Sequence, residues 1–492
     1  MSGVSPYHDA PGANITPPPG CRVTAAAFLI RHSSIYANDD EWEEYMKPFA
    51  EKVRAAQKKG TAIRSSSPLG FLSHWKSPVD DDNVSQLTRP GAEDAYAFGQ
   101  RFRKLYSPLL PPKDLGRKGK KGKKAGGKIK TPFKVWTASS ARDIGTAKAW
   151  IQGAFPHWQE GDEGEGDGKV VSLVEVPNKD PDWSISLTPH KICDAFSKEP
   201  GQAEARKWLE TFGPPALERM KRFAPGVDWE LKDVIAAQLY CGYESVVLKE
   251  RSSPFCSTEL FTQDEWRSHG YWHDLHWHHS IGYGAKISPY LGIGWLNAST
   301  HNLVSAYSPP HPHPNTTTPP ASSGLFSFPS SSDASVEGKK EKKKKGKNPS
   351  LPPPDAPPDA THTQLLFPYF THREEPPFAL VALGLWNTST ADLPSDRMPQ
   401  DRLWKTSHVI PFLGHVALEA LSCTKETLDG EDEAKDWIRV LVNGAPQKLP
   451  ECQDGPGGSC AMKQFEAFVA RRVEEYKDFE GACKEDDGES AW

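Results

Sequence analysis

The chain has no long apolar run, no closely spaced cysteine pair and few hydrophobic residues for its length. No segment approaches the roughly 20 consecutive apolar residues that a transmembrane helix requires, so no membrane partner is expected. None of the cysteines forms a CxxC pair, which argues against a zinc or redox site of that type. Residues 1–20 lack the basic and apolar regions of a signal peptide, and we expect that a leader has been removed.

The low hydrophobic content, 37% of the 492 residues, is confined to two segments. Residues 110–131 are rich in Lys and Gly, and residues 308–360 consist mostly of Pro, Ser, His, Asp and Lys. Such compositions cannot bury a core, so we predict disordered inserts within an otherwise ordinary globular chain. The net charge of −5 at pH 7 gives no reason to expect a nucleic-acid partner.

The cysteines and the glycosylation sequons point to an oxidising, secretory environment. The cysteines are even in number and lie at positions Cys21, Cys193, Cys241, Cys256, Cys423, Cys452, Cys460 and Cys483. Five N-glycosylation sequons begin at Asn14, Asn83, Asn297, Asn315 and Asn387. We therefore predict a secreted, disulfide-bonded glycoprotein.

One apolar run is followed directly by residues that can take part in catalysis. Residues Val23 to Ile30 predict a buried parallel strand, and Arg31 and His32 follow at its carboxyl end. In open α/β sheets ligands bind at that end of the strands. An imidazole can act there as a nucleophile, and a guanidinium beside it can bind an oxyanion through two parallel hydrogen bonds.

Strands and helices alternate along the rest of the chain, which favours an α/β sheet with a large helical insertion. Helices are predicted at residues 40–58, 91–105, about 141–150, much of 195–285, and 378–386, and short strands at residues 134–136 and 365–370. The segment WHDLHWHH, which begins at Trp272, has a metal-like composition. Its spacing distributes the histidines around a helix, so we predict a packed cap helix.

Three sites in order along the chain resemble the histidine acid phosphatase family, and in particular its fungal phytase-like branch. These sites are Arg31 with His32, then Arg142, then His372, each following a predicted strand. Further blocks resemble the family in the same order: Leu87–Gly91, Ser140–Gly153, Ser253–Cys256, Phe261–Trp266, Gly282–Gly284, Gly292–Asn297, Ala382–Asn387 and Val409–Phe412.

The resemblance implies a phosphoglycerate mutase-like fold, an α/β three-layer sandwich with an inserted α-helical cap. It places an arm at residues 1–20, the core at residues 21–159 and 291–492, and the cap at residues 160–290. It also implies four disulfides, which pair Cys21 with Cys423, Cys193 with Cys483, Cys241 with Cys256, and Cys452 with Cys460.

In the chemistry of that family, His32 would attack phosphorus and form a phosphohistidine. Arg31, Arg142 and His372 would neutralise the phosphate oxygens, and an acid near His372 would protonate the leaving alcohol. No metal or cofactor is implied. The expected substrate is a small phosphomonoester, with phytate as one candidate, and the oligomeric state is not indicated.

Both catalytic motifs depart from the family pattern. The signature RHGxRxP reads here with Ser33 in place of Gly and with Ile35 in place of the second phosphate-binding Arg. Losing one preorganised donor commonly costs about 10²–10³ in rate. After His372 the expected acid is replaced by Arg373, and Glu374 and Glu375 follow.

Two interpretations of the second motif remain open. Glu374 or Glu375 could be the proton donor while Arg373 supplies some of the missing positive charge at the phosphate. Alternatively, Arg373 prevents protonation, and the chain is a catalytically impaired phosphatase-like protein that binds an anionic ligand or a partner. A third alternative is an enzyme on the same scaffold with a substrate that is not a phosphate ester.

Overall fold

The computed structural model describes residues 2–60, 63, 65–113, 131–159, 169–249, 252–307, 364–387, 393–426 and 432–484. The predicted disordered insert at residues 308–360, and residues 114–130 of the insert predicted at 110–131, lie outside the described residues.

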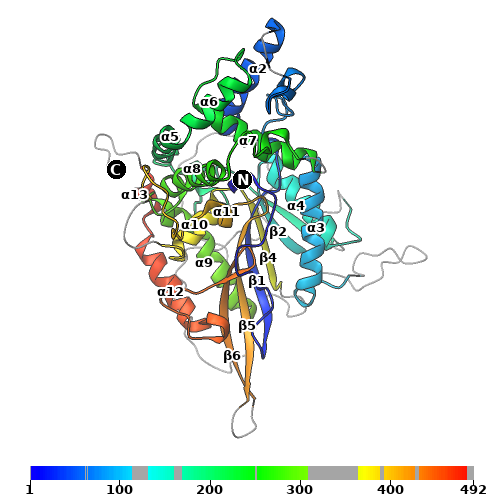
Figure 1. Cartoon of the computed structure of the whole chain (residues 1–492). Helices are drawn as coiled ribbons and strands as arrows, with labels where there is room; N and C mark the ends of the chain where they lie inside the picture. Colours follow the sequence, from blue (N-terminus) through cyan, green and yellow to red (C-terminus); the bar gives the residue numbers. More distant parts are fainter. Residues whose placement is uncertain are drawn as a thin grey trace, which may run out of the picture.

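The core is one eight-stranded sheet with the strand order β3-β2-β4-β1-β5-β6-β7, in which β8 also pairs with β6 (Figure 1). Strands β1 to β4 run parallel to their neighbours within that group, and β5 to β8 form the antiparallel part. The strands are β1 (Cys21–Arg31), β2 (Phe133–Ala138), β3 (Val171–Val176), β4 (Leu366–Thr371), β5 (His415–Glu426), β6 (Asp432–Val442), β7 (Ala445–Gln447) and β8 (Cys460–Ala461).

Strand β1 lies inside the sheet and is covered on both faces. Its residues 25–31 are all buried, which explains why the run reads as continuously apolar instead of alternating. Alternate side chains enter two different hydrophobic clusters: Ala27 and Leu29 pack on one face of the sheet, and Phe28 and Ile30 pack on the other. The strand was predicted as parallel; it pairs in parallel with β4 and in antiparallel with β5.

Helices cover both faces of the sheet, so the predicted α/β three-layer sandwich is confirmed. Figure 1 shows α3 and α4 on one side of the sheet and α9, α10 and α12 on the other. The helices are α1 (Asp39–Glu41), α2 (Lys47–Lys59), α3 (Arg89–Leu105), α4 (Ala141–Ala154), α5 (Glu199–Phe212), α6 (Pro214–Phe223), α7 (Lys232–Leu248), α8 (Gln263–Ile281), α9 (Ser288–Tyr307), α10 (Glu375–Ala382), α11 (Thr406–Val409), α12 (Met462–Glu475) and α13 (Phe479–Ala482). Short 3₁₀ turns are η1 (Ser2–Val4), η3 (Gly70–Ser73), η4 (Ser107–Leu109), η5 (Pro189–Ile192), η6 (Pro254–Cys256) and η7 (Pro456–Gly458), and residues Trp42–Met46 form one π-helical stretch, η2.

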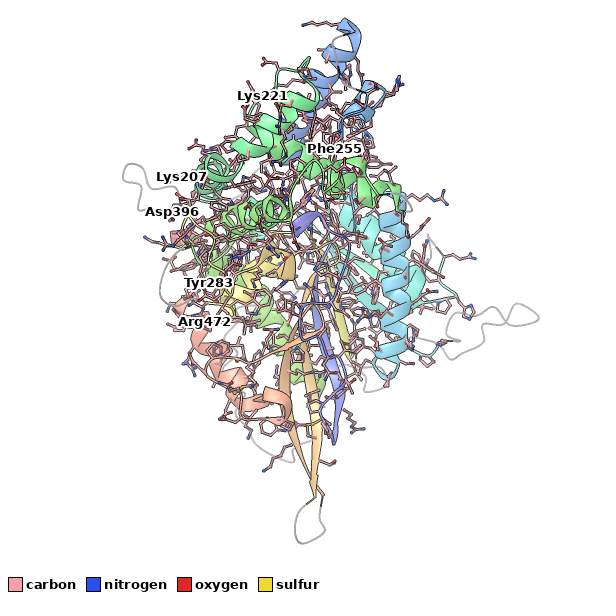
Figure 2. All side chains as sticks on the ribbon, viewed as in Figure 1. Lys207, Lys221, Phe255, Tyr283, Asp396 and Arg472 are labelled. Atoms are coloured by element: carbon pink, nitrogen blue, oxygen red, sulfur yellow. A yellow bond between two sulfur atoms is a disulfide. The ribbon has the colours of Figure 1, made fainter. Side chains whose placement is uncertain are left out.

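A helical cap built mainly from α5 to α8 gathers at one end of the sheet (Figure 1). Side chains fill the space between these helices and the sheet, and Phe255 lies fully buried among the cap helices (Figure 2). The packing departs from the predicted boundaries of 160 and 290 in two places. Strand β3 pairs with β2 in the sheet although it falls inside the predicted cap, and helix α2 packs against cap helix α7 although it falls inside the predicted core.

The sequence-based expectation for α8 is confirmed. This helix begins with a capping box between Thr262 and Glu265, and its histidines His273, His276 and His278 are buried by packing. Within the described ranges, no group of His, Cys, Asp and Glu side chains could hold a metal ion. None of the helices described here is long and apolar enough to cross a membrane.

All four disulfides implied by the family resemblance are present. They join Cys21 to Cys423, Cys193 to Cys483, Cys241 to Cys256, and Cys452 to Cys460. The first joins directly opposed residues of β1 and β5. This bridge closes a separation of 402 residues and therefore ties the strand that carries Arg31 to the C-terminal part of the sheet.

Helices α3 and α4 approach each other at two glycines. A Cβ atom added at Gly99 would lie 2.1 Å from the Trp150 carbonyl oxygen, and one at Gly153 would lie 2.0 Å from the Tyr96 carbonyl oxygen. Both obstacles are backbone atoms of the facing helix, which cannot rotate away. The position of α4 relative to the sheet, and with it the position of Arg142, depends on this close contact.

We expect that Gly99→Ala will lower the free energy of unfolding by about 2 kcal/mol or more, because the two helices must separate. Gly270→Ala is the matched control, since Gly270 lies within α8 and a Cβ there would meet nothing within 4 Å. That control should gain roughly 0.5–1 kcal/mol from helix propensity. Urea denaturation measures both, and equal effects of the two substitutions would contradict this account of the packing.

Ile35, at the place of the second phosphate-binding Arg in the family signature, is part of the hydrophobic core. Its side chain is 0% exposed and belongs to the same hydrophobic cluster as Leu29. Its backbone forms an isolated antiparallel bridge with Leu87. The site for that Arg has therefore become a packed apolar position.

We expect that Ile35→Arg will fail to restore a phosphate ligand and will destabilise the fold by about 3 kcal/mol or more, because it buries an unpaired charge. Ile35→Val should cost only about 0.5–1.5 kcal/mol. Thermal and urea denaturation, together with turnover of an aryl phosphate, check this prediction. A stable Ile35→Arg protein with faster turnover would show that the position faces the phosphate.

Candidate active site

Parallel pairing of β1 with β4 brings the two ends of the predicted site together. Arg31 lies opposite Thr371, and the backbone N–H of His32 donates a hydrogen bond of 2.8 Å to the Thr371 carbonyl. His32 therefore lies beside the chain that continues into His372. Strand β2 pairs with the other edge of β4 and leads into α4, whose second residue is Arg142. The three predicted strand-end residues meet at one edge of the sheet.

His32 is held as a neutral imidazole with one nitrogen free. Its Nδ1 lies 2.8 Å from the Ser33 carbonyl oxygen. A carbonyl can only accept, so Nδ1 carries the proton and Nε2 presents its lone pair. Burial lowers the pKa of His32 well below its usual value, and the positive charges of Arg142 and Arg31 lower it further. Burial and these charges thus favour the unprotonated imidazole, the form that a nucleophile requires.

Arg31 is anchored at one nitrogen and open along one edge. Its Nη1 donates to the carbonyl oxygens of Gly3 and Ile410, and its guanidinium stacks 4.3 Å from the centre of the Phe412 ring. Among the described residues, its Nε and Nη2 have no hydrogen-bond partner although they are buried. Burial and the charge of Arg373 lower the pKa of Arg31 to about 9, so the guanidinium stays charged in acid.

Arg142 and His372 approach from α4 and from the end of β4. The Nδ1 of His372 lies 2.8 Å from Asp143 Oδ2, an ion-pair contact whose geometry is not that of a hydrogen bond. The Nε2 of His372 lies 3.4 Å from the Ser140 hydroxyl, which accepts a hydrogen bond from Asn178. Helix α4 starts at this point, so its positive end adds to the charge of the Arg142 side chain.

Several buried polar atoms around His32 lack a hydrogen-bond partner within the described part of the chain. They include His32 Nε2, Arg31 Nε, Arg31 Nη2, Arg142 Nε, Ser33 Oγ and Ser34 Oγ, and a second group of such atoms lies in several histidines of α8. Buried donors are rarely left unsatisfied unless they have a function. The set around His32 consists of one nucleophilic nitrogen together with donors from two guanidinium groups and two hydroxyls. This chemistry fits a tetrahedral oxyanion such as a phosphoryl group.

The loop after His32 is fixed by helices α3 and α4. The backbone N–H of Ser33 donates to the Thr146 hydroxyl, and the Ser34 carbonyl accepts from the N–H and the hydroxyl of Thr88. A Cβ at Gly91 would lie 2.3 Å from the Ser34 carbonyl oxygen, so the start of α3 fits directly against this loop. The family-like block around Gly91 therefore supports the site without contributing a side chain to it.

Arg373 points toward carboxylates. Its Nη2 contacts both oxygens of Asp40 at 2.7 Å, its Nη1 contacts Glu41 at 3.0 Å, and its Nε contacts Glu374 at 3.3 Å. The ring centre of Trp277 lies 4.4 Å from the guanidinium. Every guanidinium nitrogen is engaged, so these contacts give no support to the prediction that Arg373 binds phosphate.

The two candidate proton donors have different surroundings. Glu374 is buried and forms ion pairs with Lys198 at 2.9 Å and with Arg373. Burial by itself would raise the pKa of Glu374, but Lys198 and Arg373 lower it well below its usual range. Glu375 instead contacts His190 Nδ1 at 2.5 Å and accepts from the Thr371 hydroxyl at 3.3 Å.

Four charged residues near the site were not predicted from the sequence: Asp143, Asp40, Glu41 and Lys198. Asp143 directly follows Arg142, and its position in the first turn of a helix beside a predicted site residue is a signal that could have identified it. Nothing in the sequence marks the other three residues. Asp40 is 333 residues from Arg373, and Lys198 is in a different segment again, so only folding brings them together.

Comparisons with known proteins agree with this geometry. The family model described as histidine phosphatase superfamily (branch 2) matches residues 24–443. A phytase A of Aspergillus oryzae is 25% identical over 454 residues, which cover 91% of this chain and 82% of the relative. An acid phosphatase of Komagataella pastoris is 22% identical, with 98% and 85% of the two chains covered.

Solved structures show the same fold. The phytase from D. castellii superimposes with a TM-score of 0.71 at 20% identity and covers 99% of this chain and 87% of its own. A multiple inositol polyphosphate phosphatase of Bifidobacterium longum gives a TM-score of 0.57 at 13% identity, with coverage of 95% and 97%. The predicted likeness to histidine acid phosphatases, a family of phosphomonoester hydrolases, is thus confirmed. The chain belongs to the histidine phosphatase superfamily, branch 2.

Proposed function

We propose that this protein hydrolyses phosphomonoesters at acidic pH through a phosphohistidine at His32. One observation carries the proposal: a buried imidazole with a free lone pair lies near two guanidinium groups, Arg31 and Arg142, that keep buried nitrogens without a partner among the described residues. Their positive charge suits a group that stays anionic throughout the reaction. Because the donors are already held in place, they stabilise the transition state without reorganising.

In the first step His32 Nε2 attacks phosphorus, an N–P bond forms, and the bond from phosphorus to the ester oxygen breaks. The Nε–Nη2 edge of Arg31 can bind two phosphate oxygens in parallel, because its Nη1 is already occupied by backbone carbonyls. Arg142 binds from the start of α4. Glu374, protonated in the complex, gives its proton to the departing oxygen, so an alcohol leaves instead of an alkoxide.

In the second step a water molecule attacks phosphorus and the N–P bond breaks. The Glu374 carboxylate accepts the proton of that water, which returns the residue to its starting form. Inorganic phosphate leaves and the His32 lone pair is restored. The negative charge of a bound phosphoryl group raises the pKa of a neighbouring carboxyl, which allows Glu374 to be protonated in the complex.

Among phosphomonoesters, we propose that simple esters with one phosphate are better substrates than phytate. The relatives carry the names of both phytases and an acid phosphatase, so both substrate types are candidates. The carboxylates of Asp40, Glu41 and Glu374 lie next to the proposed phosphate ligands Arg31 and Arg142. The cations that could offset their charge, Arg373 and Lys198, are already paired with them. Like charges repel, so further phosphates of a polyphosphate would be poorly accommodated there.

We also propose that the protein works outside the cell. Four disulfides join eight cysteines, and none of these cysteines is left free. Disulfides of this number persist in oxidising compartments and not in the cytosol.

We expect that His32→Ala will abolish turnover of p-nitrophenyl phosphate at pH 5, a loss of about 10⁴-fold or more, because no other group can form the covalent intermediate. A brief reaction with ³²P-labelled substrate, stopped in alkaline denaturant to preserve the acid-labile N–P bond, should label the parent protein at His32. His269→Ala, which removes a buried histidine of the cap helix, is the control and should retain activity.

Two results would refute the proposed reaction. One is the absence of turnover in the folded parent protein between pH 3 and pH 8, which would favour a silent phosphatase-like protein. The other is turnover without label at His32, which would indicate direct attack by water.

We expect that Glu374→Gln will slow glycerol 2-phosphate hydrolysis by about 10²–10³-fold but p-nitrophenyl phosphate hydrolysis by less than about tenfold. The alkoxide of glycerol is a poor leaving group that needs a proton, whereas nitrophenolate leaves without one. Steady-state kcat for both esters provides the measurement. Glu375→Gln is the comparison, and it should not change the ratio between the two esters. If Glu375→Gln changed the ratio and Glu374→Gln did not, Glu375 would be the donor.

A further inference from the structure

Five charged side chains form one connected cluster beside the catalytic histidines. Arg373 lies at the centre, and Lys198 contacts Glu374 at 2.9 Å and Asp40 at 3.4 Å. The acidic members Asp40 and Glu41 come from α1, at the opposite end of the chain from Glu374. Three carboxylates and two cations are thus joined by direct contacts.

Arg373 and Glu374 are buried members of the cluster. The side chains of Arg373 and Glu374 are 5% and 6% exposed, whereas Asp40 and Lys198 are about one-quarter exposed. The Trp277 ring lies against both cations, with its centre 4.4 Å from the Arg373 guanidinium and 5.6 Å from Lys198 Nζ. The Glu41 carboxylate also accepts from Asn38 Nδ2 at 2.8 Å. Arg373 is therefore held on all sides and cannot turn toward a phosphate without leaving carboxylates unpaired.

Arg373 and Lys198 fix the carboxylate of Glu374 in place. Arg373 contacts Oε1 of Glu374 at 3.3 Å through Nε, and Lys198 contacts the same oxygen at 2.9 Å. Because both cations hold one oxygen, Oε2 is the atom of this carboxyl that can carry a proton to a substrate. The charged and titratable groups around Glu374 are Arg373, Lys198, His190, His372, Arg31, Asp40 and His276.

We propose that Arg373 is a positioning residue, which holds the Glu374 carboxyl at the leaving-group side of the phosphate site and restricts turnover to acidic pH. The inference rests on the proposed role of Glu374 as proton donor. It gives Arg373 a function without any contact to phosphate. It also explains how an arginine can replace the acid after His372 while the chemistry is kept, since the neighbouring Glu374 takes over proton transfer.

The direction of the pH effect follows from the charges. Lys198 and Arg373 favour the ionised form of Glu374, so the free enzyme holds this carboxyl protonated only in acid. Removing the charge of Arg373 raises the pKa of Glu374, and the protonated donor then persists to higher pH. The alkaline limb of the kcat/KM profile should move upward, because that profile reports groups of the free enzyme.

The test compares Arg373→Met and Arg373→Lys with the parent protein in kcat/KM from pH 3 to pH 8. In Arg373→Met we expect the alkaline limb to move by about one pH unit or more and kcat for glycerol 2-phosphate to fall about tenfold. The kcat for p-nitrophenyl phosphate should fall less than about threefold, because that ester needs no proton donor. Arg373→Lys, which keeps the charge, should restore most of the parental profile.

Arg402→Met is the matched control. Arg402 is also largely buried, forms an ion pair with Asp274 at 2.7 Å and stacks 5.0 Å from the Tyr271 ring centre, but it does not contact Glu374. It should lower thermal stability and leave the pH profile unchanged. If Arg373→Met behaved in the same way, with both esters slowed equally and no movement of the alkaline limb, Arg373 would be merely structural and the proposal would be overturned.

A direct titration keeps this inference separate from the proposed function. The carboxyl signal of Glu374 in ¹³C-glutamate-labelled protein can be assigned by its loss in Glu374→Gln and followed with pH. An upward shift of its midpoint in Arg373→Met supports the coupling, whether or not the parent protein turns over a phosphate ester. An unchanged midpoint overturns it. Absence of turnover in the parent protein overturns the proposed function, and with it the donor role.

Discussion

The active site depends on the parallel pairing of β1 with β4. The hydrogen bond from the His32 N–H to the Thr371 carbonyl places the nucleophile beside the segment that begins at His372. More than 330 residues separate the two strands, so the site cannot form before the sheet does. The disulfide from Cys21 to Cys423 then joins β1 to β5 on its other side. Closing so long a loop raises the free energy of the unfolded chain relative to the folded one.

Electrostatics at the site is divided between two neighbouring groups of charges. Arg31 and Arg142, close to His32, keep nitrogens without a partner in the part of the chain that the structure describes, and this excess of positive charge suits a phosphoryl group. The neighbouring cations Arg373 and Lys198 are instead paired with carboxylates. The first group can bind and stabilise an anion. The second group can control whether Glu374 is protonated, because a change in the charges around this carboxyl changes its pKa.

Two of the departures from the family motifs, at Ile35 and Arg373, have different physical causes. The phosphate-binding Arg of the family is absent at position 35. The Ile35 side chain packs there in the hydrophobic core, where a guanidinium could not be solvated. Arg373 stays close to the site, but Asp40 and Glu41 from the distant helix α1, together with the adjacent Glu374, occupy its donors. Comparison with the family motifs alone would relate both positions to the gain or loss of phosphate binding. Only the contacts in the structure distinguish Ile35, a core residue, from Arg373, which we propose is a positioning residue.

The sequence by itself determined the fold class and predicted His32 as the nucleophile and Arg31 and Arg142 as phosphate ligands, because the apolar strand before Arg31 and the motifs around Arg142 and His372 are local patterns. Burial on both faces makes such a strand recognisable without its neighbours. The disulfide pairing followed from the family resemblance. The antiparallel strands β5 and β6 and the edge strand β3 were not predicted, since their existence depends on the strands they pair with.

Only the tertiary structure decided the role of the residues around Glu374. Two carboxylate partners of Arg373 lie in α1, and Lys198, the second cation on Glu374, lies just before α5, so their effect on the Glu374 carboxyl arises from proximity that no sequence spacing encodes. Charge interactions act through space and strengthen as water is excluded. The same reasoning applies to His372 and Asp143, which meet only because β4 ends and α4 begins at the same edge of the sheet.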